Sequence, residues 1–326
     1  MKQWSTLEWR AEATTWLDDR LADAGITRTG AVEQPRIRPW ATVMHAPTTA
    51  GTVWLKAAGA GTRFEVGLYE LLAATVPDRV LIPIATDVER GWIVLPDGGP
   101  TFAERFEGAA VVEPFAAAVT QYARLQIALV PHIDELLARG VADMRPARMP
   151  ERFEEALAAT TGIDDAAHDK IAAMRATYRQ WCAQLERSAV PASLDHNDLH
   201  PYNVLGDAPH AITFYDWGDS VVAHPFAVML VALTVLRDML DVATDDPVVL
   251  RVRDAYLAEF ASIAPDEDLV ATLELACRVA KAARALTWER ALRAARDDGE
   301  PIDHDWANAP LETLTMLLDP SYLTSR

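Results

Sequence analysis

The pattern of apolar residues changes once along the chain, near residue 98, and this change limits the fold more than any other feature of the sequence. Before it, runs with the two-residue period of strands are mixed with segments of helical period; after residue 113 almost every segment is helical in period. Asp97-Gly98-Gly99-Pro100 interrupts both patterns. The chain has 326 residues, about twice the length of an average domain. We therefore expect an α+β fold of two lobes, a small β-rich one over 1–98 and a large, mainly helical one over 99–326.

The first part of the chain predicts a small unit in the order helix, hairpin, helix and two strands. Ser5 is a candidate N-cap of the first helix, and Glu8, three residues later, would complete a capping box. The expected elements are a helix over 5–24, a hairpin over 38–57, a helix over 62–74, and strands over 79–84 and 91–95.

The second part predicts a helical domain with one interruption. Helical periodicity covers 113–139, 150–160, 165–187, 226–242, 247–263, 268–297 and 310–318. Between these helices, residues 192–220 have short apolar runs separated by polar loops. This segment predicts a hairpin set into the helical domain.

The net charge of −18 is unevenly distributed along the chain. Residues 1–100 carry 10 Lys and Arg against 12 Asp and Glu, whereas residues 101–326 carry 20 against 36. Nucleic acids and anionic membranes bind positive surfaces, so neither is expected as a partner. The acidity of the second part has two interpretations: it keeps the protein soluble, or it attracts a positively charged small molecule.

No segment has the features of a membrane span or an export signal. The longest apolar run, 225–236, is too short to cross a bilayer and predicts a buried helix. The N-terminal residues have neither the basic nor the apolar region of a signal peptide. Cys182 and Cys277 lie far apart in helical patterns, which favours small buried side chains over a disulfide. We expect a cytoplasmic protein.

Residues 193–220 (SLDHNDLHPYNVLGDAPHAITFYDWGDS) gather the polar groups that phosphoryl transfer requires. This reaction needs Mg²⁺ at the phosphate oxygens, a carboxylate that orients or deprotonates the attacking hydroxyl, and a further oxygen ligand for the metal. Asp198 is the candidate base, and Asn203 and Asp216 are the candidate Mg²⁺ ligands. The strand-forming residues 211–215 would hold Asp216 in place.

The same residues leave other interpretations open. His196, Asp198, His200 and Asp216 also have the spacing of a dinuclear metal site, as in a metallohydrolase. A nucleotide-binding pseudokinase with a regulatory role is a third hypothesis, although it predicts the loss of Asp198 or Asp216 and both are present. His200 would either contact metal or phosphate or brace the loop, and Asp219 would either support the metal or hydrogen-bond the loop.

HNDLHPYN at 196–203, followed by YDWGD at 215–219, resembles the catalytic and metal-binding loops of the aminoglycoside phosphotransferase and choline kinase-like family. The resemblance implies the two-lobed protein-kinase-like fold. It also implies a kinase that uses ATP and Mg²⁺ to phosphorylate a hydroxyl of a small molecule. The sequence does not identify the acceptor: aminoglycosides, amino sugars, other sugars, choline-like amines and nucleosides all stay open.

The resemblance also implies roles for individual residues. His196 would brace the catalytic loop, Asp198 would be the base, and Asn203 with Asp216 would bind Mg²⁺. The residue before the base is commonly glycine in this family, and here it is Asn197. Asparagine tolerates unusual backbone angles better than most residues with a side chain, so activity is still expected.

Lys56 is the only lysine between residues 3 and 169, and it lies in a predicted strand. An isolated ammonium group on an apolar strand needs a partner. Glu65, near the start of the next helix, is the expected partner, and Glu70 is the alternative. A Lys56–Glu65 pair would resemble the kinase ion pair that positions the ATP phosphates.

Residues 91–99 (GWIVLPDGG) resemble the strand and hinge that bind adenine through backbone hydrogen bonds in kinases. The expected contacts are Leu95, Asp97 and Gly98, because Pro96 has no N–H to donate. The hairpin before Lys56 has no G-x-G-x-x-G sequence, so it adds no support for a phosphate-binding loop.

Overall fold

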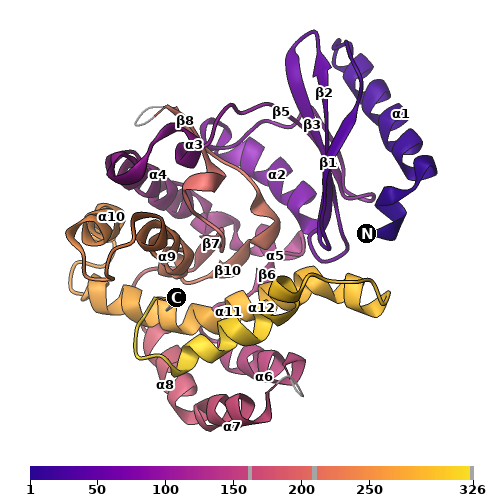
Figure 1. Ribbon diagram of the computed structural model, residues 1–326. Coiled ribbons are helices and arrows are strands. Elements are labelled where there is room, and N and C mark those ends of the chain that lie inside the picture. The colour runs from indigo at the N-terminus through magenta and orange to yellow at the C-terminus, as the bar shows by residue number, and fades with distance from the viewer. Residues whose placement is uncertain (161–163, 208–210, 324–326) are drawn as a thin grey trace. The chain divides into compact units, whose positions relative to one another are not determined.

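The computed structural model describes residues 1–160, 164–207 and 211–323 (Figure 1). The chain forms two compact units. The first comprises Met1–Gly99 and Arg290–Ala307, and the second comprises Pro100–Glu289 and Asn308–Arg326. The sequence suggested one boundary and did not indicate that the segment 290–307 belongs with the first unit. Helical periodicity shows that a helix has a buried face but not what covers it.

The first unit contains a five-stranded sheet in which all paired strands are antiparallel. The strand order is β1-β2-β3-β5-β4. The elements are α1 (Leu7–Asp23), β1 (Glu33–Ile37), β2 (Ala41–Thr48), β3 (Gly51–Ala58), α2 (Phe64–Thr75), β4 (Ala85–Asp87) and β5 (Trp92–Pro96). The predicted order of helices and strands is confirmed, with β1 as an additional edge strand.

Alternation along β3 separates its side chains onto two faces. Leu55 and Ala57 are buried in a core cluster that includes Trp16 of α1 and Trp92 of β5. Figure 1 shows α1 running beside the sheet. Lys56, between the two buried positions, is directed to the other face of the strand.

The start of α1 differs from the prediction. Thr6, not Ser5, is the N-cap, and its hydroxyl accepts a hydrogen bond from the Trp9 amide at 3.2 Å. Ser5 instead belongs to a short 3₁₀ helix, Lys2–Ser5, which precedes the cap. Both hydroxyl residues suit a cap by type, so sequence alone did not choose between them.

The strand predicted over 79–84 was also misplaced, because pairing begins only after Pro83. Proline has no N–H and cannot donate to a strand ladder. The next residue, Ile84, donates its amide to the Val94 carbonyl at 2.8 Å, and β4 follows at once.

The second unit is mainly helical, as predicted. Its helices are α3 (Phe102–Arg105), α4 (Val112–Leu129), α5 (Ile133–Ala138), α6 (Met149–Ala159), α7 (Asp165–Ala173), α8 (Arg175–Leu185), α9 (Met229–Leu240), α10 (Pro247–Leu257), α11 (Leu269–Asp297, up to Glu289 in this unit) and α12 (His304–Thr315, from Asn308 in this unit). The single helix expected over 113–139 is interrupted by a 3₁₀ turn, Val130–His132, that contains Pro131.

Two expectations about buried segments are confirmed. The apolar run 225–236 forms a 3₁₀ turn, Pro225–Val228, and the first turns of α9, and most of its side chains are buried. Cys182 and Cys277 are both free and buried. No helix in the described part of the chain is long and apolar enough to cross a membrane.

Two small sheets lie within the helical unit. One contains β6 (Ala142–Asp143), β10 (Val221–Ala223) and β7 (Ser193–Asp195) in that spatial order. The other is the antiparallel pair β8 (Val204–Asp207) and β9 (Ala211–Phe214), which is the hairpin predicted within 192–220.

Candidate active site

Strand pairing brings two loops of the second unit together. The loop 196–203 connects β7 to β8, and the loop 215–220 connects β9 to β10. Because β7 pairs with β10 and β8 pairs with β9, both loops start and end at the same two ladders. The Tyr215 amide also donates to the Asn203 carbonyl at 3.4 Å. The two sequence motifs therefore lie side by side.

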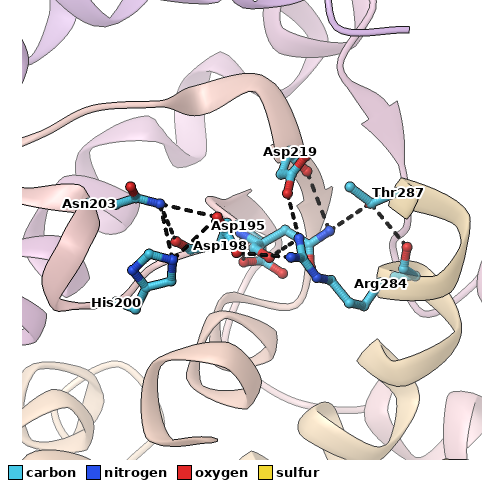
Figure 2. Close-up of polar contacts among 9 residues, drawn as sticks. Asp195, Asp198, His200, Asn203, Asp219, Arg284 and Thr287 are labelled. Carbon is cyan, nitrogen blue, oxygen red and sulfur yellow. Dashed lines mark hydrogen bonds and ion pairs between the residues drawn. The ribbon is translucent and has the colours of Figure 1, made fainter. Parts of the chain in front are cut away.

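Asp198 lies at the centre of a network of polar contacts (Figure 2). Its Oδ1 accepts a hydrogen bond from Arg284 Nη2 at 2.9 Å. Its Oδ2 accepts one from Asn203 Nδ2 at 3.2 Å and lies 3.4 Å from His200 Nε2. The side chain is 26% exposed, so the carboxylate is fixed by protein groups and still accessible to a ligand.

Arg284 of α11 was not among the predicted site residues. Its side chain is 12% exposed, and Nη1 donates to Asp219 Oδ2 at 2.6 Å and to the Asn197 carbonyl at 2.8 Å. The sequence contains one weak signal for this role. Arg284 lies within an apolar stretch of the predicted helix, directly after Ala283. A guanidinium group that is buried at such a position needs anionic partners.

These contacts keep Asp198 ionised. Burial by itself would raise the pKa of Asp198, but the positive charge of Arg284 and the hydrogen bond with His200 lower it further than burial raises it. The resulting pKa lies well below the ordinary value of an aspartate. Asp198 is therefore a carboxylate at neutral pH, able to accept a hydrogen bond from a ligand hydroxyl.

Two non-glycine residues of the paired loops have left-handed backbone conformations. Asn197 has φ 59° and Asp216 has φ 63°. Asparagine and aspartate adopt this region more readily than other residues with a side chain. We expected Asn197 to adopt a backbone conformation that favours glycine, and its φ of 59° has this conformation. At Asp216 the same conformation turns the chain soon after β9.

Asn203 and Asp216 are the residues that could hold a magnesium ion. Asn203 Nδ2 donates to the Asp198 carbonyl at 2.9 Å as well as to its carboxylate. Figure 2 shows the amide oxygen of Asn203 on the side away from these contacts. Asn203 directly precedes β8 and Asp216 follows β9, so both lie at the same end of the hairpin. An amide oxygen and a carboxylate are hard oxygen donors of the kind that Mg²⁺ prefers.

The two histidines of the first motif have different surroundings. His196 is fully buried, and its Nε2 lies 3.0 Å from the Tyr215 carbonyl, which joins the two loops. Burial lowers the pKa of His196, so the neutral ring donates this bond. His200 Nε2 lies 3.4 Å from Asn203 Nδ2 as well as near Asp198. His196 thus joins the two loops, and His200 lies beside Asp198 and Asn203, while the roles expected for the two histidines stay predictions.

Asp219 contacts an arginine through the carboxylate that we considered for metal support. Its Oδ2 accepts the 2.6 Å hydrogen bond from Arg284. Its carbonyl lies 3.4 Å from Asn197 Nδ2. The carboxylate of Asp219 thus binds α11 and its backbone carbonyl contacts the loop 196–203, while metal support by Asp219 stays a prediction.

The first unit contains the expected lysine and glutamate pair. Lys56 Nζ lies 2.8 Å from both Glu65 Oε1 and Oε2, and the glutamate side chain is 1% exposed. The alternative partner, Glu70, accepts a hydrogen bond from the Thr86 hydroxyl at 2.7 Å. Lys56 therefore pairs with Glu65, as the sequence suggested.

The hinge segment differs from the expectation in one respect. The Asp97 amide donates to the Thr52 carbonyl at 3.0 Å, so this N–H is not the open donor that we expected for adenine. The Asp97 carboxylate instead organises the turn, because it accepts hydrogen bonds from the Gly99 amide and from Trp54 Nε1. Among the expected donors, the Gly98 amide remains.

The sequence model of a phosphotransferase enzyme family matches residues 54–267, about two thirds of the chain. The match includes Lys56, Glu65 and both loop motifs. The chain belongs to this phosphotransferase enzyme family.

Solved structures show that this phosphotransferase has a protein-kinase-like fold. The APH(2″)-IIia complex with GDP and kanamycin matches with a TM-score of 0.59 and 16% identity over 93% of this chain and 97% of that chain. Macrolide 2′-phosphotransferase MphH from Brachybacterium faecium matches with a TM-score of 0.56 and 16% identity over 94% of this chain and 98% of that chain. Choline kinase LicA from Streptococcus pneumoniae matches with a TM-score of 0.59 and 12% identity over 93% of this chain and 99% of that chain. No curated protein sequence matches the chain significantly.

A second carboxyl group lies directly before the loop 196–203. Asp195, the last residue of β7, is 1% exposed. Its Oδ1 accepts the Asn197 amide at 2.7 Å, and its Oδ2 has no hydrogen-bond partner in the described part of the chain. Burial raises the pKa of Asp195 to about 7, against the smaller lowering effects of the Asn197 amide and Arg284.

Because the folded-state pKa of Asp195 exceeds its ordinary value of 3.8, the contribution of this one group to stability is fully present below that value and is lost as the pH rises through about 7. Asp195→Asn keeps the acceptor oxygen for the Asn197 amide and removes the titration. We expect it to raise the melting temperature relative to the wild type by about a few degrees more at pH 8 than at pH 5. Calorimetry at both pH values, with the exposed Asp78→Asn as control, measures this. An equal shift at both pH values would contradict the prediction.

Proposed function

We propose that this protein transfers the γ-phosphate of ATP to a hydroxyl group of a small molecule. The observation that carries the proposal is the joining of the two motif loops, in which Asp198 is held by Asn203 while its carboxylate stays accessible. In the transfer, the acceptor O–H would give its proton to Asp198 as the new O–P bond forms. The bond between the β- and γ-phosphates breaks, and ADP leaves.

Metal binding would fall to Asn203 and Asp216, for the reasons of donor chemistry and position given above. Bound Mg²⁺ neutralises phosphate charge in such reactions. Asn203 would then have two tasks, because its amide nitrogen holds the base while its oxygen is directed elsewhere. His196 would keep the two loops in register, and His200 and Asp219 would hold the groups around Asp198.

The first unit, residues 1–98 in the expected division, would bind the nucleotide. Lys56, kept in place by the buried Glu65, supplies a positive charge for phosphates. The backbone at Leu95 and Gly98 would contact the adenine, and Asp97 would shape that turn. The second unit would supply the catalytic loop and the acceptor site. APH(2″)-IIia is described with GDP, and we propose ATP for this chain. We also propose a cytoplasmic location, where ATP is available as the phosphate donor.

The rival hypotheses have less support. A dinuclear hydrolase site would need His196, Asp198, His200 and Asp216 around common metals. Within the described residues, however, no group of three or more His, Cys, Asp or Glu side chains is arranged to hold a metal ion. His196 is instead directed to the Tyr215 carbonyl. A pseudokinase is disfavoured because Asp198, Asn203, Asp216 and Lys56 are all present.

Asp198→Asn should reduce kcat by about 10²–10⁴-fold and leave the Kd for ATP within about twofold, because the base acts on the acceptor and not on the nucleotide. Asparagine keeps an acceptor oxygen for Asn203. ADP release during an acceptor screen over aminoglycosides, sugars and choline-like compounds, together with calorimetric ATP binding, measures both effects. Asp207→Asn, in the same hairpin, is the control. Near-native turnover of Asp198→Asn would exclude Asp198 as the base.

Asp216→Asn should remove most of the effect of Mg²⁺ on ATP binding, because it removes a charged metal ligand. The factor by which Mg²⁺ lowers the Kd for ATP should be about tenfold or more smaller in the variant than in the wild type. Asparagine is also tolerated at positive φ, so the backbone should be preserved. Titration calorimetry of wild type and variant, each with Mg²⁺ and with EDTA, compares the two. If Mg²⁺ tightened binding equally in both proteins, the metal ligand would be a different residue.

The uneven charge of the chain leads us to propose a cationic acceptor. Choline kinase and the kanamycin complex are among the structural neighbours. Arg284 occupies one side of Asp198, so the positive group of such an acceptor would bind elsewhere on the acidic second unit. The KM of the acceptor should then rise several-fold from low to near-physiological salt, as screening sets in over about 8–10 Å. A neutral acceptor, or a KM insensitive to salt at saturating ATP, would contradict this.

A further inference from the structure

Asn197 does more than tolerate the backbone angles of a glycine position. Its side chain is buried, with the residue 3% exposed, and Nδ2 donates to Thr287 Oγ1 at 2.7 Å. The Thr287 hydroxyl in turn donates to the Ala283 carbonyl at 3.1 Å. A hydroxyl has one proton, so this bond leaves a lone pair of the oxygen for Asn197. A glycine at position 197 could not make this contact with α11.

Arg284 contacts the same peptide from one helical turn away. Arg284 and Thr287 are three residues apart on α11 and therefore share a face of the helix. Arg284 binds the Asn197 carbonyl and the Asp198 carboxylate together. Its guanidinium also lies 5.1 Å from the ring centre of Trp288. One segment of α11 therefore holds the carbonyl and side chain of Asn197 as well as the carboxylate of Asp198. Figure 2 shows Arg284 and Thr287 of this segment beside Asp198.

We propose that Arg284 and Thr287, acting through Asn197, form a clamp that positions the carboxylate of Asp198 for phosphoryl transfer. They are positioning residues rather than catalytic ones, and the proposal rests on the proposed function. A base must stay within a fraction of an ångström of its productive place, and small displacements reduce the rate strongly. The clamp fixes Asp198 through its own side chain and through the peptide before it.

The test uses Asn197→Gly and Thr287→Val, alone and together, in the full-length protein. Glycine keeps the positive φ without the side chain, and valine keeps the shape of threonine without the hydroxyl. Each single variant should lower kcat about tenfold, with the KM for MgATP unchanged, and the double variant should be no worse than either. Thr287→Ser should restore most of the activity lost in Thr287→Val. Arg284→Lys should lower kcat as well, because the single ammonium group of lysine cannot replace the two Nη groups with which the planar guanidinium binds separate oxygens.

Thr120→Val is the matched control. Thr120 lies in α4, and its hydroxyl lies within hydrogen-bond distance of the Ala116 carbonyl four residues earlier and of the Ala255 carbonyl in α10. It repeats the bond from Thr287 to Ala283, but neither of its own acceptors belongs to a loop motif. It should leave kcat unchanged. Native kcat in Asn197→Gly and Thr287→Val, or independent multiplicative losses in the double variant, would overturn the clamp.

A second measurement separates failure of the clamp from failure of the proposed function. If the wild type releases no ADP with any acceptor or with water, the proposed function fails. The clamp is then judged by hydrogen–deuterium exchange of the peptide 196–203. Exchange there should be at least about threefold faster in Asn197→Gly and Thr287→Val than in wild type and Thr120→Val, because loss of the bonds frees the loop. Equal exchange in all four proteins would overturn the clamp.

Discussion

The pairing of β7 with β10 and of β8 with β9 is the constraint on which the rest of the site depends. Each of these strands has only three or four residues, yet each ladder ends where the two motif loops begin. Because both loops connect the same two ladders, the loop with Asp198 and Asn203 must run beside the loop with Asp216. The strands β7 and β10 are buried along their whole length, β8 and β9 are partly exposed, and the Asp198 side chain in the loop between β7 and β8 is 26% exposed, so a ligand can reach it.

Charge is the second organising factor of the site. An ion removed from water is costly unless partners replace its hydration, and Arg284 meets this need through Asp198 and Asp219. The same contacts hold the pKa of Asp198 low. Asp195, only three residues earlier, is also an aspartate. One of its oxygens has no hydrogen-bond partner among the residues that the structure describes, and burial raises its pKa to about 7. Surroundings rather than residue type thus set which carboxyl is ionised.

Much of the site was accessible from local sequence. The loop motifs, the hairpin between them and the Lys56–Glu65 pair were all expected, because short-range spacing and strand periodicity determine them. What the sequence missed depends on distant partners. The Asp97 amide was expected to be open, but it is bonded to the carbonyl of Thr52, on a neighbouring strand. Arg284 belongs to no recognisable sequence motif. Its contacts are with the two loops, which come from distant parts of the chain.

The sequence by itself therefore determined the class of protein, an α+β phosphotransferase, and placed the candidate base Asp198 and the candidate oxygen ligands Asn203 and Asp216 in two short motifs. Only the tertiary structure decided how that base is held. The side chain of Asn197 reaches Thr287, and Arg284 joins Asp198 to Asp219, across some 65 to 90 residues of chain. The physical reason is that periodicity and motifs report contacts within a few residues. Hydrogen bonds and ion pairs between distant segments exist only once packing has brought their atoms within about 3 Å.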